Sequence, residues 1–184
     1  MRVRTASRWR AWAALGVAAL ATGLVSACGG ASSAGPADGF QRVRTGWVQL
    51  DVPEDWREVA LDAGQDDLWK VSYEDPQGTT QLLLAPEYSD HSTAGEANAD
   101  LVGLVQLGQY PSFEIVPREE NKDQDDFRTF ARTDATYGEG TTYEAVIWGV
   151  ADEDEHAVLA QLTSESLDPQ LVQQIEDSFV VDAG

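Results

Sequence analysis

The stretch TYEAVIWGV, residues 142–150, decides the fold class because its apolar residues lie on both faces of the strand that it predicts. Val146 and Trp148 alternate on one face, and Ala145 and Ile147 alternate on the other. A strand that is apolar on both faces lies inside a sheet with packed layers on either side. The stretch therefore predicts a central strand that is covered above and below.

Period-two patterns around this stretch predict the other strands of the sheet. The segment Asp75-Pro76-Gln77-Gly78 has the residues of a type I turn, with proline second and glycine fourth, so the strands beside it form a hairpin. Short turns elsewhere also favour antiparallel pairing. The predicted strands cover residues 43–52, with a bend at Gly46, and residues 68–73, 80–85, 113–116, 127–137, 142–150 and 158–163.

Two segments change to the helical period and supply the covering layers. Residues 91–109 contain Thr93 and Glu96 at the spacing of a capping box. A second helix begins after Asp168, its N-cap, with Pro169 at the first helical position. Its apolar stripe comprises Leu171, Val172, Ile175 and Phe179. One helix on each face predicts an α+β fold, a three-layer α/β/α sandwich with a mainly antiparallel sheet of about six to seven strands and two main helices.

The N-terminal residues have the pattern of an export signal. Four arginines precede a short apolar run at residues 12–25, which is too short to span a membrane comfortably. The run ends in Val25-Ser26-Ala27-Cys28, which resembles the lipobox of bacterial lipoproteins and contains the only cysteine of the chain. This resemblance implies cleavage between Ala27 and Cys28 and a lipid on the thiol of Cys28. An ordinary secretory signal peptide cleaved nearby is the alternative.

These features divide the chain into three parts. Residues 1–27 form the predicted lipoprotein signal peptide, and residues 28–39, rich in Gly, Ser and Ala, form a flexible tether. Residues 40–184 form the folded α/β/α domain. We therefore expect the mature protein on the outer face of the cell membrane, held there by its lipid anchor.

The charge of the chain is strongly negative. Removal of residues 1–27 would take away four of the twelve basic residues and no acidic one, leaving eight basic against 32 acidic residues and a formal charge of −24. Such a surface argues against binding to nucleic acid and against docking on anionic lipid headgroups through the protein itself. A solvated acidic surface is the simplest interpretation, and a cation-collecting surface is the alternative.

The order of elements resembles that of the PsbP-like superfamily over about residues 40–180. The residues that carry the likeness are Pro53-x-x-Trp56 after the first strand and Ile175-x-x-Ser178-Phe179 in the closing helix. Together with the lipobox, they make the chain similar to actinobacterial LpqN-type lipoproteins. The resemblance implies non-catalytic work, such as accessory binding in photosystem II, Ran binding or roles in the cell envelope. It implies no particular binding residue.

No motif of a known reaction is present in the sequence. HExxH, GxSxG, a P-loop and GxGxxG are all absent. The two histidines, His91 and His156, are predicted to be exposed residues at turns. A metal site built from His156 with Asp152 and Asp154 is the alternative for the second histidine. Asp123, Asp125 and Asp126 lack the glycine and the distal glutamate of a calcium-binding EF-hand loop and are read as solvated acids. No metal and no cofactor is therefore predicted.

Four tryptophans and two acids of the folded domain are the remaining candidates for a site. Trp56 and Trp148 are predicted to be core residues. Trp47 and Trp69, on or beside outer strands, either pack in the core or offer an indole face to a ligand. The acids on predicted strands, Asp134 and Glu144, are expected to be edge-facing or outward-facing residues.

The favoured function is that of a lipid-anchored accessory protein of the cell envelope, without catalytic activity, that docks a protein or an envelope ligand on a sheet edge or a helix groove. Its predicted partners are the membrane, through the anchor, and an envelope protein or ligand, but not nucleic acid. A structural or assembly subunit of a membrane secretion or transport complex is the alternative. A carboxylate-dependent envelope hydrolase is a third possibility.

Overall fold

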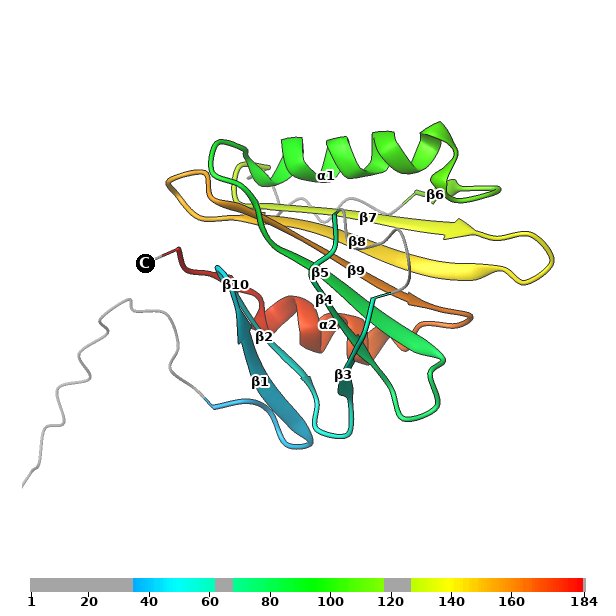
Figure 1. Cartoon of the computed structure of the whole chain (residues 1–184), viewed down its shortest axis with the longest axis horizontal. Coiled ribbons are helices and arrows are strands. Elements are labelled where there is room, and N and C mark those ends of the chain that lie inside the picture. Colours follow the sequence, from blue (N-terminus) through cyan, green and yellow to red (C-terminus); the bar gives the residue numbers. More distant parts are fainter. Residues whose placement is uncertain (1–34, 62–67, 118–126, 184) are drawn as a thin grey trace, which may run out of the picture. The chain divides into compact units, whose positions relative to one another are not determined.

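A computed structural model of the chain describes residues 35–61, 68–117 and 127–183, and Figure 1 shows the arrangement of their elements. The strands are β1 (Phe40–Thr45), β2 (Val48–Pro53), β3 (Arg57–Val59), β4 (Val71–Glu74), β5 (Thr80–Ser89), β6 (Glu114–Val116), β7 (Phe130–Tyr137), β8 (Tyr143–Ala151), β9 (Ala157–Ser164) and β10 (Val180–Val181). The helices are α1 (Ala94–Leu104), the π-helical turn η1 (Val105–Gln109) and α2 (Pro169–Ser178).

The main sheet has seven strands in the order β3-β4-β5-β9-β8-β7-β6, and all neighbours are antiparallel. β8 lies inside the sheet between β9 and β7, as its two apolar faces predict. Trp148 of β8 pairs with Ala160 of β9 on one side and with Arg132 of β7 on the other. The indole of Trp148 is fully buried.

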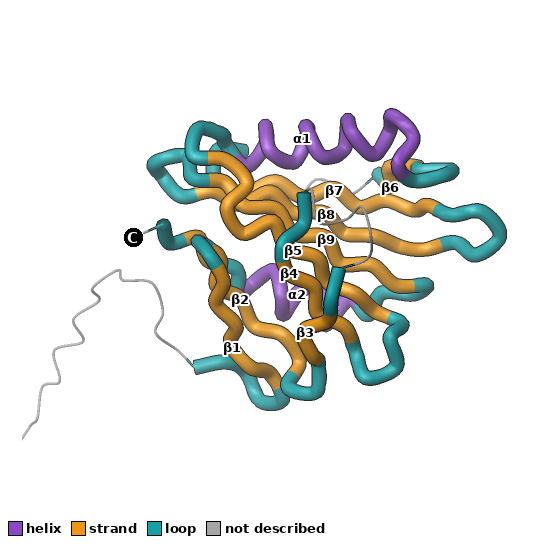
Figure 2. The backbone as a smooth tube through the Cα atoms, in the orientation of Figure 1, coloured by secondary structure: helices purple, strands orange, loops and turns teal. Residues whose placement is uncertain are grey.

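The two helices cover opposite faces of this sheet (Figures 1 and 2). On one face, Ile147 and Leu159 pack with Ala97 and Leu101 of α1. The core of the other face includes Trp148, Leu162, Leu82, Val172 and Ile175, the last two from α2. The predicted three-layer α/β/α sandwich is therefore confirmed, because alternate residues of β8 supply both cores.

A second, smaller sheet departs from the prediction of one strand over residues 43–52. The chain instead forms a hairpin of β1 and β2 around the two-residue turn Gly46-Trp47, with Gly46 at a φ of +50°. β10 pairs with the other edge of β2, giving the order β1-β2-β10. Val48, Leu50 and Val52 of β2 are buried in the same core as α2. The hairpin therefore belongs to the α2 side and not to the main sheet.

Both helices begin where the sequence predicts. Thr93 and Glu96 form a reciprocal capping box at α1, and the side chain of Asp168 accepts a hydrogen bond from the amide of Gln170 at α2. The predicted strand at 127–137 begins later, at Phe130, since the carbonyl of Phe127 accepts a hydrogen bond from the first turn of α1. In the described part of the chain, no helix has the length and apolar character needed to cross a membrane.

Gly103 offers a first test of this packing. It lies in α1, and a Cβ there would meet nothing within 4 Å. Gly103→Ala should therefore raise the free energy of unfolding by up to about 1 kcal/mol, because alanine loses less backbone entropy in a helix. Urea denaturation followed by circular dichroism measures the change. A clear loss of stability would contradict the open surroundings of this position.

Candidate functional site

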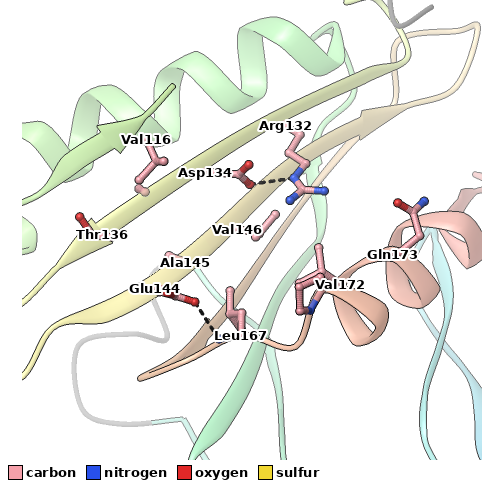
Figure 3. Close-up of a pocket in the computed structure, with 12 residues that line it drawn as sticks. Val116, Arg132, Asp134, Thr136, Glu144, Ala145, Val146, Leu167, Val172 and Gln173 are labelled. Atoms are coloured by element: carbon pink, nitrogen blue, oxygen red, sulfur yellow. Dashed lines mark hydrogen bonds and ion pairs between the residues drawn. The ribbon is translucent and has the colours of Figure 1, made fainter. Parts of the chain in front are cut away.

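The α2 side of the main sheet has a pocket of about 370 Å³ at one flank (Figure 3). The pocket lies between strands β6, β7 and β8 and the beginning of α2. One row of paired residues crosses its floor, from Val116 of β6 through Asp134 of β7 to Val146 of β8. The lining residues are Val116, Arg132, Asp134, Ala135, Thr136, Glu144, Ala145, Val146, Leu167, Pro169, Val172 and Gln173.

Aliphatic side chains form much of the pocket wall. Val116 and Val146 come from the sheet, and Leu167 and Val172 come from the beginning of α2. The amide of Leu167 donates a 2.8 Å hydrogen bond to Oε2 of Glu144 on β8. This hydrogen bond connects the residues just before α2 to β8, and it therefore fixes the position of the α2 wall of the pocket relative to the sheet.

One end of the pocket is a charged network around Arg132. Its Nε lies 2.8 Å from Oδ1 of Asp134, and its Nη1 lies 2.7 Å from Oε2 of Glu176 in α2. The same Glu176 oxygen accepts a 2.9 Å hydrogen bond from Nε1 of Trp148. The side chains of Arg132 and Glu176 are only 13% and 10% exposed. Little water screens this network, so Arg132 is held by its carboxylates.

The pocket carries net negative charge. Among its lining residues Arg132 is the only basic one, and it is outnumbered by the carboxylates of Asp134, Glu144 and the adjoining Glu176. Glu114 of β6 adds an exposed carboxylate at the end of the pocket away from Arg132, because it pairs with Thr136, which in turn pairs with Glu144. The pocket therefore combines an aliphatic wall with an acidic rim, a combination that suits an elongated cationic group.

The residues proposed for lipid attachment and cleavage, Cys28 and Ala27, lie outside the described residues, as do Asp123, Asp125 and Asp126. Trp69 is 4% exposed and packs in the core beneath α1, so its indole is a core residue in this structure. Trp47 is half-buried at the tip of the β1–β2 hairpin. Neither tryptophan lines the pocket.

Trp47 is instead the neighbour of His156. Their rings make an edge contact with centroids 5.0 Å apart, and Nδ1 of His156 lies 2.7 Å from Oδ2 of Asp152. Oδ1 of Asp152 accepts hydrogen bonds from the amides of His156 and Asp154, so both of its oxygens are engaged within the turn. His91 is exposed beside Asp90. Across residues 35–61, 68–117 and 127–183, no three His, Cys, Asp or Glu side chains gather as a metal site requires.

The contacts of Asp152 in the turn that contains His156 should make the stability of the protein depend on pH. Burial works to raise the pKa of Asp152, but hydrogen bonds from the amide and ring of His156, the charge of His156 and the amide of Asp154 outweigh it and lower that pKa. A carboxylate with a lowered pKa in the folded state stabilises the protein above its unfolded pKa and loses this effect as pH falls through the folded value.

Asp152→Asn should therefore be less stable than the native chain at pH 7, and the two should converge below about pH 4. Thermal unfolding across pH measures the difference. Asp154→Asn, which removes an exposed carboxylate of the same turn, is the control. A difference that persists unchanged to low pH would contradict this role of Asp152.

The sequence does not predict this pocket. It predicts only that Asp134 and Glu144 are edge-facing or outward-facing residues. Both line the pocket: Glu144 is exposed, as expected, and Asp134 is half-buried against Arg132. The partners that the sequence does not predict are Arg132 and Glu176. The signal that links Val116, Asp134 and Val146 is strand register, which requires knowing which strands pair.

A second hollow of about 540 Å³ lies between the loops after β2 and β4 and the first turns of α2. Trp56 and Leu171 contribute apolar surface, and Asp75 contributes a carboxylate. Burial opposes but does not prevent a lowered pKa for Asp75, since hydrogen bonds from Thr79 and Thr80 stabilise its charged form. This carboxylate organises its own turn, which leaves the flank beside β6 as the stronger candidate site.

Comparison with solved structures shows what this arrangement is similar to. The Ran-binding protein Mog1p of Saccharomyces cerevisiae matches 77% of this chain and 95% of its own, at 13% identity and a TM-score of 0.54. Cyanobacterial PsbP (CyanoP) from Synechocystis matches 85% of this chain and 98% of its own, at 16% identity and a TM-score of 0.54. No protein-family model matches the sequence, and no curated protein matches it significantly. The chain therefore has the α+β fold that CyanoP and Mog1p share, as the resemblance to PsbP-like proteins predicted.

Proposed function

We propose that this protein is a lipid-anchored accessory module of the cell envelope that binds a partner and catalyses no reaction. The observation that carries the proposal is the pocket beside β6. Its walls are aliphatic, and its one arginine is already held by Asp134 and Glu176. Such a site offers shape and charge to a partner, which is what binding requires.

A carboxylate-dependent hydrolase is the weaker candidate for the same pocket. Its two lining acids, Asp134 and Glu144, would have to act as an acid and a base or nucleophile. Asp134 is paired with Arg132, and Glu144 accepts a hydrogen bond from the amide of Leu167. Both carboxylates thus have structural partners, and we assign them to the shape and charge of a binding site.

The location is proposed from the N-terminal sequence. A positive segment, a short apolar run and Val25-Ser26-Ala27-Cys28 support lipid attachment at Cys28, as in the LpqN-type lipoproteins that the chain resembles. Each buried methylene contributes about 0.8 kcal/mol, so two or more acyl chains make a stable anchor. The acidic domain has no electrostatic attraction to anionic headgroups, so the lipid is the proposed means of attachment to the membrane.

The anchor predicts the behaviour of Cys28→Ala in intact cells. The variant should leave the membrane fraction or remain unprocessed, because it has no thiol for the lipid. Fractionation, with mass analysis of the N-terminal peptide, reads out both results. Ser26→Ala is the matched control, since it keeps a small residue before the cysteine and should leave attachment unchanged. A Cys28→Ala chain that is processed and still bound to the membrane would contradict the proposed lipid attachment.

The binding role is tested by photo-crosslinking in cells. A crosslinking residue placed in turn on several exposed surfaces of the domain should capture one reproducible partner from one surface only. Glu139, exposed in the turn between β7 and β8, is a suitable background position. An integral membrane partner captured in fixed stoichiometry would favour an assembly subunit. Capture from no surface would contradict the binding role.

A further inference from the structure

We propose that β6 and the pocket beside it bind an extended segment of a partner protein as an eighth strand of the main sheet, with a lysine or arginine of that segment seated in the pocket. The inference rests on the proposed binding function and names the class of partner. Three features carry it: a strand edge with no partner strand among the described residues, a pocket on one face of that edge, and the charge of the pocket.

The first feature is the outer edge of β6. This strand is the last in the sheet, and no backbone hydrogen bond joins its outer edge to any residue that the structure describes. The opposite edge strand, β3, exposes the charged side chains of Arg57 and Glu58, a common protection against unwanted pairing. β6 exposes one charged residue, Glu114, together with Ile115 and Val116, which are 48% and 42% accessible. An edge on which two of the three residues are apolar and exposed is only partly protected by charge, and it is suited to strand addition.

The second feature is the alternation of side chains along β6. Val116 pairs with Asp134 and lines the pocket, whereas its neighbour Ile115 pairs with Ala135 and lies on the α1 side of the sheet. Side chains of an added strand would alternate between the same two faces. Adjacent strands lie roughly 4.8 Å apart, so a long side chain on the pocket face would cross Val116 and enter the pocket.

The third feature is the composition of the pocket. The methylene stem of a lysine or arginine would lie on Val116, Val146 and Val172. Its cationic head would meet the rim formed by Glu114 and Glu144. Acidic segments would be repelled both by this rim and by the chain as a whole, whose formal charge is −20. Charge complementarity therefore selects a basic partner segment.

The probe is the peptide acetyl-Thr-Val-Lys-Val-Lys-Val-Thr-amide, titrated calorimetrically into the full chain in detergent at low salt. Its lysines share one face when it is extended, and its valines share the other. A second peptide with glutamate in place of lysine tests charge. Two further forms carry N-methyl groups on either the valines or the lysines, so that each loses the central backbone donors of one strand edge. One of these two must lose binding if the peptide adds to β6.

Matched variants place the peptide on the structure. Val116→Arg should weaken binding by about tenfold or more, because it fills the pocket with a like charge. Ile115→Arg adds the same charge on the other face of β6 and should change binding by less than about threefold. Glu144→Gln keeps an acceptor for the amide of Leu167 and should weaken binding several-fold. Glu139→Gln, the matched control in the exposed turn between β7 and β8, should leave binding unchanged. Circular dichroism verifies that each variant is folded.

The proposal is upheld by binding that needs lysine, one unmethylated edge and Val116. It is overturned if the native chain does not bind the peptide at about 1 mM, if both N-methylated forms bind like the parent, or if Val116→Arg and Ile115→Arg behave alike. Self-association through β6, detected by sedimentation and abolished by Val116→Arg, would also overturn it. In each of those cases the crosslinking experiment in cells still decides the general binding role separately.

Discussion

Gly149→Ala is expected to lower the free energy of unfolding by about 2 to 4 kcal/mol. Gly149 lies in β8 directly beneath α1. A Cβ there would collide with the backbone carbonyl of Ala94 and would lie 3.1 Å from the Cβ and amide nitrogen of Asn98. Since these contacts are mostly backbone, the helix itself would have to move.

Displacement of α1 would also break a buried polar contact. Nδ2 of Asn98 donates to the carbonyl of Ile147 at 3.1 Å, and Oδ1 of Asn98 accepts from Thr133 at 2.7 Å. Urea denaturation measures the loss, with Gly103→Ala as the control in which the same methyl group meets open space. Equal stability changes for the two alanine variants would show that α1 does not sit tightly on β8.

Glu176→Ala is expected to cost about 3 to 5 kcal/mol, because it leaves the largely buried Arg132 without one of its carboxylates. It also leaves Nε1 of Trp148 without its acceptor. Glu176→Gln should cost less, since it retains an oxygen for the indole. Asp177→Ala changes the exposed residue next in α2 and should alter stability by less than about 0.5 kcal/mol.

A double variant tests whether the charges of Arg132 and Glu176 stabilise the fold as a pair. Arg132→Met with Glu176→Leu removes both charges of this pair, and it also takes Arg132 away from Asp134 and the acceptor away from Nε1 of Trp148. Because each single change leaves the other charge of the pair without its partner, the double variant should lose less stability than the sum of Arg132→Met alone and Glu176→Leu alone. Chemical denaturation of the native chain, the two single variants and the double variant provides the comparison. A double variant less stable than the sum of its single changes would contradict the assigned pairing.

The layered fold could be predicted because its determinants are local. Thr93 with Glu96, and Asp168 with Pro169, mark the beginnings of the two helices by chemistry that acts within one turn. The two apolar faces of 142–150 likewise report burial on both sides. Each of these features is confirmed by the structure.

The small sheet could not be predicted in the same way. Gly46-Trp47 lacks the Asn-Gly or Asp-Gly signature of a two-residue hairpin turn. The sequence therefore predicts one bent strand where the structure has β1 and β2. β10 contains only Val180 and Val181, too few residues for any periodicity. Its pairing with β2 comes from the tertiary position of the C-terminal end of α2.

The pocket is a product of topology. Arg132 and Glu176 are 44 positions apart, and in sequence each is one ordinary charge in a chain that has many. Val116 belongs to a three-residue strand whose significance comes from its place at the edge of the sheet. A list of acids could therefore not identify Asp134 and Glu144 as pocket residues, because register and the position of α2 bring them together.

The central claim is that a partner binds at the flank formed by β6 and the beginning of α2. Amide hydrogen exchange of the full chain, residue by residue, with and without the lysine peptide, tests it most directly. We predict that the outward-pointing amides of Glu114–Val116 become protected while those of the opposite edge strand, Arg57–Val59, do not change. Unchanged exchange along β6 at a peptide concentration that saturates the chain, or protection confined to another surface, would contradict the account.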